Sequence, residues 1–407
     1  MVFDNVESML EKVSPILNLT MQEKKRLLTF QSIQRAQLSV AGKKYPAYRI
    51  IHNNALGPGK GGIRFHPNVS EDEVKSLSFW MSMKNSLAGL PFGGGKGGVI
   101  VDPKKFSPAE LQELSRQYIR AFEQFIGQDK DIPAPDVYTN PQIMAWMLDE
   151  FEKIKGHHEP GFITGKPVEL GGTALRGDST SKGGFIIFNE LIKKEKLNKK
   201  TLTVAVQGFG NAGWFKAKYL YDNKFKVVAV SDSQGGIYNK KGLHIINVKD
   251  AKDKGKSVQD YTQGTHITNN ELLELDVDIL VLAALENQIT VENADKIKAK
   301  YIIELANGPI NPQADAILHK KKIVVLPDIL ANSGGVIGSY FEWANNRAGN
   351  IFELQHLTRL FDERMKETFD KVWIAFEKQK RQYDIRTIAY LIAIKRIIDA
   401  EKLRGRI

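Results

Sequence analysis

The stretch 201-TLTVAVQGFGNAGWFKAKYL-220 joins an apolar run to a glycine-rich turn and then to the start of a helix. Gly208, Gly210 and Gly213 have the G-x-G-x-x-G spacing of a dinucleotide-binding turn, although any glycine-rich turn can show this spacing. Here the motif follows a strand, opens a helix and precedes a second strand that ends at Asp232. This context predicts a βαβ unit whose helix N-terminus binds a pyrophosphate and whose acidic residue accepts hydrogen bonds from the adenosine ribose.

Asp232 also bears on which dinucleotide binds. A carboxylate at this position repels the 2′-phosphate of NADP, which favours NAD. The segment that follows, 233-SQGGIYNKK-241, brings Lys240 and Lys241 near in sequence and leaves NADP open. We therefore expect NAD or NADP as the cofactor, with NAD favoured.

Around this motif, short apolar strands alternate with helices. Such strands, buried on both faces, indicate a doubly wound parallel sheet. The expected strands are Thr201–Gln207, Lys226–Ser231, Asp278–Ala283, Tyr301–Leu305 and Ile323–Leu326. The sequence predicts an α/β protein of two lobes with a cleft between them.

Helix signals mark the N-terminal half. Residues 1–30 have the apolar spacing of an amphipathic helix, and a β-like run follows at Tyr45–Ile51. Ser70 followed by Glu73 predicts a capping box at the start of the next helix. We therefore expect this lobe to contain both helices and strands.

Composition limits the class of protein. The chain has 407 residues, 42% of them hydrophobic, and no cysteine, which excludes disorder, disulfides, thiolate zinc sites, iron–sulfur clusters and a cysteine nucleophile. The N-terminal MVFDNVESMLEKV carries acids where a signal peptide needs basic residues, and no apolar run approaches the ~18 residues of a membrane span. We expect a cytoplasmic protein without a membrane segment.

The net charge of +11 could suggest a nucleic-acid partner. The lysines are dispersed along the chain with acids nearby, however, which is typical of a solvated surface. We therefore expect no nucleic-acid partner, and a basic field that attracts small anions.

Three lysines have unusual surroundings: Lys60 in GPGKGG, Lys84 in MKNS and Lys96 in GGGKGG. Most lysines of the chain fit an exposed surface, but these three have small or apolar neighbours and no acid nearby in sequence. Ammonium groups that converge in a cleft suit an anionic substrate, and their repulsion and burial lower the pKa of at least one toward that of a general base. Asp136, in 131-DIPAPDVYTNPQ-142, is a candidate proton-transfer partner, although alone it also fits a turn aspartate.

These motifs carry a family resemblance. From about residue 30 to the C-terminus the chain resembles the hexameric glutamate dehydrogenases of the glutamate/leucine/phenylalanine/valine dehydrogenase superfamily. The similar motifs are GPGKGGIRFHP, LPFGGGKGGV, DIPAPDV, TGKPVELGG, GFGNAG, SDSQGGIYN, AALENQIT, LANGPINPQAD, PDILANSGGVIGSYFEW and KLRG.

The resemblance implies roles for the lysines and for Asp136. Lys60 would bind the substrate side-chain carboxylate and Lys84 the α-carboxylate. Lys96 would be the catalytic lysine, and Asp136 would transfer a proton.

The resemblance implies further binding residues. Ser339 would hold the side-chain carboxylate from the second lobe, with Val336 lining the pocket. Thr180 would contact the nicotinamide amide, Asn211 would touch the cofactor in the glycine-rich turn, and Arg176 would join them as a cofactor-binding residue.

The implied activity is the reversible NAD(P)-dependent oxidative deamination of L-glutamate to 2-oxoglutarate and ammonium, with no metal. The implied architecture has a substrate-binding and oligomerisation domain (1–178), a Rossmann-type dinucleotide-binding domain (179–344) and C-terminal helices (345–407) that return to the hinge. The usual assembly of the family is a homohexamer. Two rivals remain: a dehydrogenase of apolar amino acids, which we expect to lack a charge at position 60, and a catalytically idle paralogue.

Two departures from the family pattern stand out. Gly95 stands where GGAKGG is more common. The segment 171-GGTALRGDSTSKGGF-185 stands where the family reads close to GGSLGRTEATGRGV, so Ser181 and Lys182 replace glycine and arginine. The second departure is the only support for the idle-paralogue reading.

Overall fold

A computed structural model describes residues 3–254 and 257–407. The chain forms two compact units. Unit 1 consists of residues 1–177, 336–361 and 390–407, and unit 2 of residues 178–335 and 362–389. The chain therefore passes between the units four times, and the expected C-terminal segment 345–407 is divided between them.

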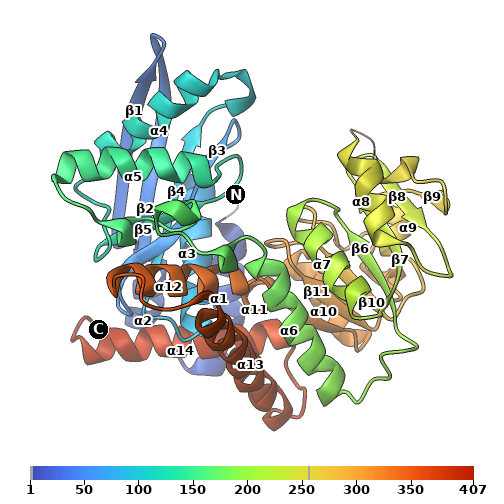
Figure 1. The fold of residues 1–407 in the computed structure, drawn as a ribbon. Helices are drawn as coiled ribbons and strands as arrows, with labels where there is room; N and C mark the ends of the chain where they lie inside the picture. Colours follow the sequence, from blue (N-terminus) through green and yellow to red (C-terminus); the bar gives the residue numbers. More distant parts are fainter. Residues whose placement is uncertain (1–2, 255–256) are drawn as a thin grey trace. The chain divides into compact units, whose positions relative to one another are not determined.

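Unit 1 is built on a mixed five-stranded sheet in the order β1-β2-β4-β3-β5 (Figure 1). The first two pairings are antiparallel and the last two are parallel. The strands are β1 (Ser32–Val40), β2 (Lys43–Asn53), β3 (Gly59–His66), β4 (Gly94–Ile100) and β5 (Asp131–Pro135). The helices are α1 (Asp4–Leu17), α2 (Met21–Leu28), α3 (Glu71–Leu87), α4 (Pro108–Phe122) and α5 (Pro141–Lys155), with most of α12 (Gly334–Arg347) and of α14 (Ile385–Leu403).

Alternating side chains of this sheet enter two different cores. Ala47 of β2 and Ile63 of β3 pack with Leu114 of α4 and Met147 of α5, whereas Ile50 of β2 packs with residues on the opposite face. Such alternation is the expected period of a strand with both faces covered.

The predicted capping box at Ser70 forms only in part. The Ser70 side chain accepts a hydrogen bond from the Glu73 amide, which caps α3. The Glu73 carboxylate pairs with Arg64 of β3 instead of returning to the cap. The tertiary partner outcompetes the local one, because a guanidinium offers a charged donor.

Unit 2 contains a seven-stranded sheet in the order β12-β11-β10-β6-β7-β8-β9 (Figure 1). Its strands are β6 (Thr203–Gln207), β7 (Lys226–Asp232), β8 (Gly235–Tyr238), β9 (Thr265–Ile267), β10 (Ile279–Leu282), β11 (Tyr301–Glu304) and β12 (Val324–Leu326). Its helices are α6 (Ser179–Lys194), α7 (Asn211–Asp222), α8 (Ile245–Asp253), α9 (Asn269–Leu273), α10 (Pro312–Lys320), α11 (Asp328–Ala331) and most of α13 (Leu354–Lys378). The five strands predicted from the sequence are parallel in it, which confirms the doubly wound fold.

The sheet differs from the prediction at one edge. β8 and β9 extend it with antiparallel pairings that the sequence analysis did not predict. Gly235 has φ +143° in the turn from β7, a conformation that L side chains rarely adopt, and this lets the chain reverse directly into β8.

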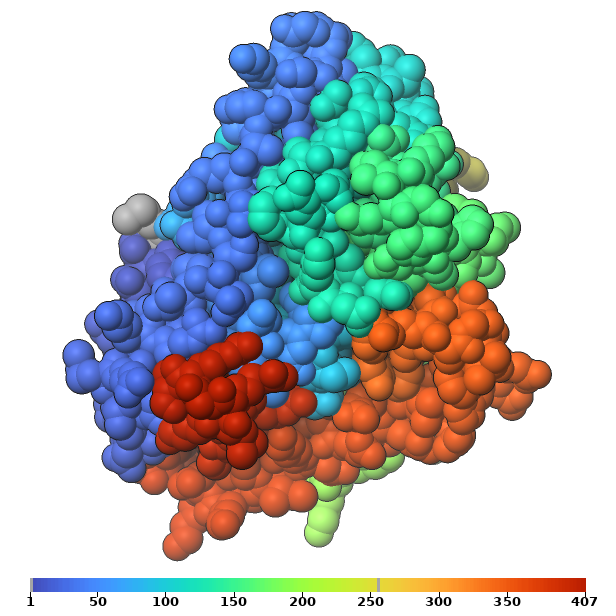
Figure 2. All heavy atoms as spheres, turned by 90° about the vertical axis from the view of Figure 1, so that its left-hand side faces the viewer, coloured from blue at the N-terminus to red at the C-terminus, as the bar shows by residue number. Residues whose placement is uncertain are grey.

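The two ends of the chain meet within unit 1. Figure 2 shows the last residues packed against the N-terminal segment. Arg26 and Asn53 both donate to the Glu401 carboxylate, and Arg404 donates to the Ala55 carbonyl oxygen. Within the described ranges, no helix has the length and apolar character to span a membrane.

Candidate functional site

Unit 1 brings Lys60, Lys84, Lys96 and Asp136 together in one fold. Lys60 lies on β3 and Lys96 on the neighbouring β4, Lys84 lies on α3, and Asp136 directly follows β5. The three lysines are only 1%, 8% and 6% exposed. Buried lysines are rare because burial penalises the ammonium, so these positions differ from the surface lysines of the chain.

Lys96 forms an ion pair with Asp136. Burial lowers the pKa of Lys96, and the Asp136 carboxylate opposes this only in part. Burial by itself raises the pKa of Asp136, but the charges of Lys96 and Arg64 outweigh it and hold that pKa well below its ordinary value. The pair thus joins a carboxylate to a lysine that loses its proton more readily than a surface lysine does.

Arg64 connects this pair to α3. Its guanidinium lies 3.6 Å from Asp136 Oδ1 and also pairs with Glu73. Asp136 itself is held by its neighbours, because its backbone amide donates to Thr139 Oγ1 over 2.7 Å. Loop and strand therefore fix the carboxylate beside Lys96.

Among the residues that the structure describes, no carboxylate accepts a hydrogen bond from Lys60. Its Nζ donates to the Pro133 carbonyl oxygen over 3.3 Å. Burial lowers the pKa of Lys60 well below its ordinary value, and the nearby charges of Arg176 and Arg49 lower it further. The charges of Glu342 and Asp131 oppose this shift only in part, so the surroundings of Lys60 favour an anion.

The glycines beside these lysines make room for other parts of the fold. A Cβ on Gly61 would lie 1.7 Å from the Gly95 carbonyl oxygen, and one on Gly95 would lie 2.4 Å from Asp131 Oδ1. Asp131 is fully buried and pairs with Arg49, whose Nη1 donates to the Gly61 carbonyl oxygen over 3.1 Å. Gly95, one of the departures noted in the sequence, thus leaves space for a buried ion pair that the sequence analysis missed.

Ser339 and Val336 lie on the part of α12 that belongs to unit 1. The sequence analysis expected Ser339 on the second lobe, but the structure places it in the same unit as Lys60. Arg176 donates from Nε to Ser339 Oγ over 3.2 Å, also within unit 1. Arg176, grouped above with the cofactor-binding residues, therefore lies near Lys60, whose pKa its charge lowers.

Lys166 is a buried residue that the sequence analysis did not single out, although it stands in the quoted TGKP motif. Its Nζ donates to Glu342 Oε1 and Asn346 Oδ1, both over 2.8 Å, and to the Ile163 carbonyl oxygen over 2.6 Å. Glu342 also accepts from the Gly165 amide. This network fixes α12, and with it Ser339, to the loop that precedes Arg176.

In unit 2 the glycine-rich turn has the shape that a dinucleotide requires. A Cβ on Gly213 would lie 1.7 Å from the Gly208 carbonyl oxygen, and Gly208 has φ +87°. Gly210, which precedes the first residue of α7, Asn211, has open space where a side chain would be, and no side chain caps the helix. The free amides and open approach fit a pyrophosphate.

Asp232 ends β7, as predicted, but its carboxylate is already engaged. Oδ2 accepts from Lys252 Nζ over 2.7 Å and from the Val258 amide over 3.0 Å, and Oδ1 accepts from Ser257 Oγ over 3.1 Å and the Gln234 amide over 3.0 Å. Burial raises its pKa, but the hydrogen bonds from Lys252 and the two amides outweigh this, and its pKa is lowered. The cation on Asp232 is thus Lys252 rather than Lys240 or Lys241.

The second part of the segment that departs from the family pattern, residues 178–185, belongs to unit 2. Ser181 Oγ donates to the Ala212 carbonyl oxygen over 2.7 Å, which ties α6 to the glycine-rich turn. Lys182 pairs with Asp362 of α13 over 2.7 Å. Thr180 lies near the start of α12, because a Cβ atom on Gly335 would be 3.0 Å from Thr180 Oγ1. Both replacements therefore have partners.

Two polar groups near the carboxyl ends of the parallel strands were not predicted. Gln207 ends β6, and Asn332 follows α11. Gln207 Oε1 and Asn332 Oδ1 are buried without a hydrogen-bond partner. Ligands of doubly wound sheets bind at these strand ends, so both amides are candidates to bind the cofactor. In the parts of the chain that the structure describes, no three His, Asp or Glu side chains gather as a metal site.

Comparisons with known proteins agree with this arrangement. Residues 171–405 match the family model "Glutamate/Leucine/Phenylalanine/Valine dehydrogenase", and residues 31–153 match "Glu/Leu/Phe/Val dehydrogenase, dimerisation domain". The chain is 47% identical to the NAD-specific glutamate dehydrogenase of Staphylococcus aureus (strain COL), over 89% of this chain and 87% of that protein. It is also 47% identical to the NADP-specific glutamate dehydrogenase of Synechocystis sp., over 89% and 86%.

Solved structures give the same result. The hetero-hexameric glutamate dehydrogenase from Thermus thermophilus, in its leucine-bound form, has a TM-score of 0.94 at 32% identity, covering 99% of this chain and 97% of the other. The glutamate dehydrogenase from Peptoniphilus asaccharolyticus has a TM-score of 0.85 at 36% identity, covering 100% and 98%. The chain belongs to the glutamate/leucine/phenylalanine/valine dehydrogenase family, among its glutamate dehydrogenases.

Proposed function

We propose that the chain catalyses the reversible NAD(P)-dependent oxidative deamination of L-glutamate to 2-oxoglutarate and ammonium. The observation that carries this proposal is the buried Lys96–Asp136 pair in a unit that also buries Lys60 and Lys84. A substrate with two carboxylates supplies the negative charge that these lysines lack.

We assign Lys60 to the side-chain carboxylate and Lys84 to the α-carboxylate. The Arg176–Ser339 hydrogen bond supports adding both residues to the side-chain carboxylate site, with Val336 beside them. An apolar amino acid would leave the Lys60 ammonium without an acceptor in a buried place, which disfavours the rival reading.

The bound nicotinamide ring supplies the redox chemistry by accepting a hydride from the substrate α-carbon. Lys96, once neutral, takes a proton from the water that adds to the substrate iminium carbon. Asp136 carries the proton that the departing amino nitrogen requires. The lowered pKa of Lys96 supports the first role, because a general base works best when its pKa lies near the working pH.

For the cofactor, we assign Gly208, Gly210, Asn211 and Gly213 to the pyrophosphate and Thr180 to the nicotinamide amide. We propose that NAD is preferred and NADP accepted. The Asp232 carboxylate disfavours a 2′-phosphate. Lys252, however, pairs with Asp232, and 30% of the Lys252 side chain stays exposed. That ammonium is available to a 2′-phosphate at the same position.

Kinetics with both dinucleotides test the proposal. Reduced nicotinamide, followed by absorbance, should form with L-glutamate plus NAD and more slowly with NADP. Lys252→Ala should lower kcat/KM for NADP relative to that for NAD, and Asp232→Ser should raise it. Lys254→Ala, an exposed position just after α8, is the matched control. No turnover with glutamate would refute the function, whereas an unchanged NADP/NAD ratio in the Lys252 variant would refute only its role.

We propose a homohexamer as the assembly. Support comes from the match to a dimerisation domain over residues 31–153 and from β1, an edge strand of unit 1 with many exposed residues. Light scattering after size exclusion should give about six chain masses. The cytoplasmic location stays a prediction.

A further inference from the structure

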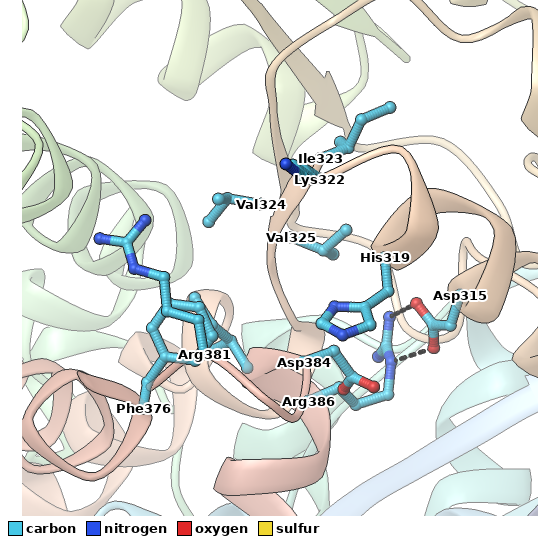
Figure 3. Close-up of a pocket in the computed structure, with 11 residues that line it drawn as sticks. Asp315, His319, Lys322, Ile323, Val324, Val325, Phe376, Arg381, Asp384 and Arg386 are labelled. Atoms are coloured by element: carbon cyan, nitrogen blue, oxygen red, sulfur yellow. Dashed lines mark hydrogen bonds and ion pairs between the residues drawn. The ribbon is translucent and has the colours of Figure 1, made fainter. Parts of the chain in front are cut away.

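Unit 2 contains a cavity that none of the assigned roles uses. Its volume is about 330 Å³, within the range of small-molecule sites. It lies between the edge strand β12 and the turn that joins α13 to α14, and α10 closes its floor (Figure 3). All of its lining residues belong to unit 2.

Most of the wall is apolar. Ile323 and Val325 line one side and Phe376 and Ile385 the other, and each is less than a tenth exposed. Figure 3 shows the residues of the β12 segment opposite Phe376 and Arg381. A ligand with an apolar body would bury its surface against both sides.

The two acids of the cavity already have hydrogen-bonding partners within the protein. Asp315 pairs with Arg386 over 2.6 Å at the floor, where the two side chains point toward each other (Figure 3). Asp384 accepts from the amide and the hydroxyl of Thr387 and so caps α14. A cationic ligand would therefore find no free carboxylate here.

The two cations at the rim of the cavity, Arg381 and Lys322, differ in whether they are paired. Arg381 pairs with Glu195 and Glu377. The side chain of Lys322, by contrast, makes no hydrogen bond or ion pair within residues 3–254 and 257–407. It ends the run 319-HKKK-322, which faces the basic turn 378-KQKR-381 across the cavity. The free charge at the entrance is thus positive.

The edge strand adds a polar contact inside the apolar wall. The Val324 amide donates to the Lys300 carbonyl oxygen, toward β11. Successive residues of a parallel strand bond toward opposite sides, so the peptide groups of Val325 point away from β11 and toward the cavity. They offer a ligand one donor and one acceptor.

We propose that this cavity binds a small amphiphilic carboxylate, an aryl- or alkyl-substituted acid. Its apolar body would lie between Val325 and Phe376, and its carboxylate would pair with Lys322. The proposal concerns a second site, independent of the active site and of the proposed reaction.

Calorimetric titration of the full-length assembled protein with 4-phenylbutyrate tests this site. Saturating NAD and 2-oxoglutarate are present throughout, so that the dinucleotide and substrate sites are occupied. We expect a dissociation constant of about 1 mM or tighter, as is usual for a ligand of this size. The neutral amide of the same acid should bind at least about 5-fold more weakly, because it lacks the charge that Lys322 recognises.

Three variants locate the binding. Lys322 has φ +61°, and asparagine tolerates this conformation, so Lys322→Asn removes the charge without straining the turn. It should weaken binding about 5-fold or more, and Val325→Trp should abolish it by filling the cavity. Lys320→Asn, an exposed position in the same run that does not line the cavity, should bind normally.

Three results would overturn the proposal: no binding of 4-phenylbutyrate, equal binding of its amide, or unchanged affinity in Lys322→Asn. If Val325→Trp does not fold, as judged by its melting temperature, Lys322→Asn and the amide decide the question alone.

Discussion

Arg176 donates from its Nε to the Oγ of Ser339 over 3.2 Å, although 162 residues lie between them in the chain. Arg176 ends a short 3-10 turn at Ala174–Arg176, and Ser339 lies on α12. Arg176 is also the first of the nearby charges that lower the pKa of Lys60. Because Ser339 and Lys60 are assigned to the substrate carboxylate, this contact favours substrate binding over cofactor binding as the role of Arg176.

Arg176→Ala should raise KM for glutamate about 10- to 100-fold, because a charged hydrogen-bond donor is lost from the carboxylate site. KM for NAD should change less than about 2-fold. Steady-state kinetics with each substrate varied in turn measure both values. Arg347→Ala, on the same helix as Ser339 and paired with exposed Asp129, is the control. A larger effect on NAD than on glutamate would return Arg176 to the cofactor.

Lys60→Leu should lose most activity on glutamate, since it removes the buried ammonium and leaves an apolar pocket floor. The double variant Lys60→Leu with Ser339→Val should gain measurable activity on norvaline. The measurement is the ratio of kcat/KM for glutamate to that for norvaline. A parent enzyme that prefers norvaline would contradict the glutamate assignment, as would a Lys60→Leu variant with the parent's ratio.

Lys96→Ala should lower kcat by about 10²–10⁴-fold, the usual contribution of a general base, and leave NAD affinity nearly unchanged. Asp136→Asn should behave in the same way, since the amide keeps the shape of the side chain but cannot carry the proton. Stopped-flow and binding measurements separate turnover from affinity. Turnover within a few-fold of the parent in either variant would mean that the role is assigned wrongly.

The pH dependence of kcat/KM should respond to the charges around Lys96. Lys96 acts when neutral, so activity rises with pH through its pKa. The charge of Arg64 lowers that pKa and the charge of Glu73 raises it. Arg64→Gln should therefore shift the rising limb to higher pH, and Glu73→Gln should shift it to lower pH. Arg64→Lys keeps the charge and serves as the control, and shifts of the same sign in both Gln variants would exclude this electrostatic account.

Glu304 gives unit 2 a pH-dependent stability. It shares the Arg386 guanidinium with Asp315 and Asp328, and burial together with these carboxylates raises its pKa to about 8. The folded state therefore keeps a proton that the unfolded state releases above about pH 4.5. Its contribution to stability is complete below that pH and is lost as the pH rises through about 8.

Glu304→Gln has no proton to lose at this position. Relative to the parent, this variant should be more stable at pH 9 than at pH 6, as measured by melting temperature at the two values. Glu195→Gln, a carboxylate outside the Arg386 cluster, controls for general charge effects. If the melting temperatures of the parent and of Glu304→Gln changed equally between pH 6 and pH 9, Glu304 would not hold a proton in this cluster.

Local sequence patterns were enough for much of unit 2. The apolar run of β6, the glycines at 208 and 213 and the helix that follows are near neighbours in the chain, and their conformations depend on one another. The same holds for Asp232, which the strand pattern placed at the end of β7. The three buried lysines could be singled out as well, because the absence of acids among their chain neighbours is itself a local property.

What only the tertiary structure decided are contacts between residues distant in the chain. Gly61 and Gly95 lie in strands where a side chain has no room: the Gly95 backbone occupies the space beside Gly61, and Asp131 and Arg49 occupy the space beside Gly95. Lys252, 20 residues from Asp232, engages its carboxylate, and Ser339 shares a unit with Lys60. The side chain of a lysine, serine or aspartate determines which hydrogen bonds and ion pairs it can form. Its actual partner is determined only when the packed chain brings a donor and an acceptor close together.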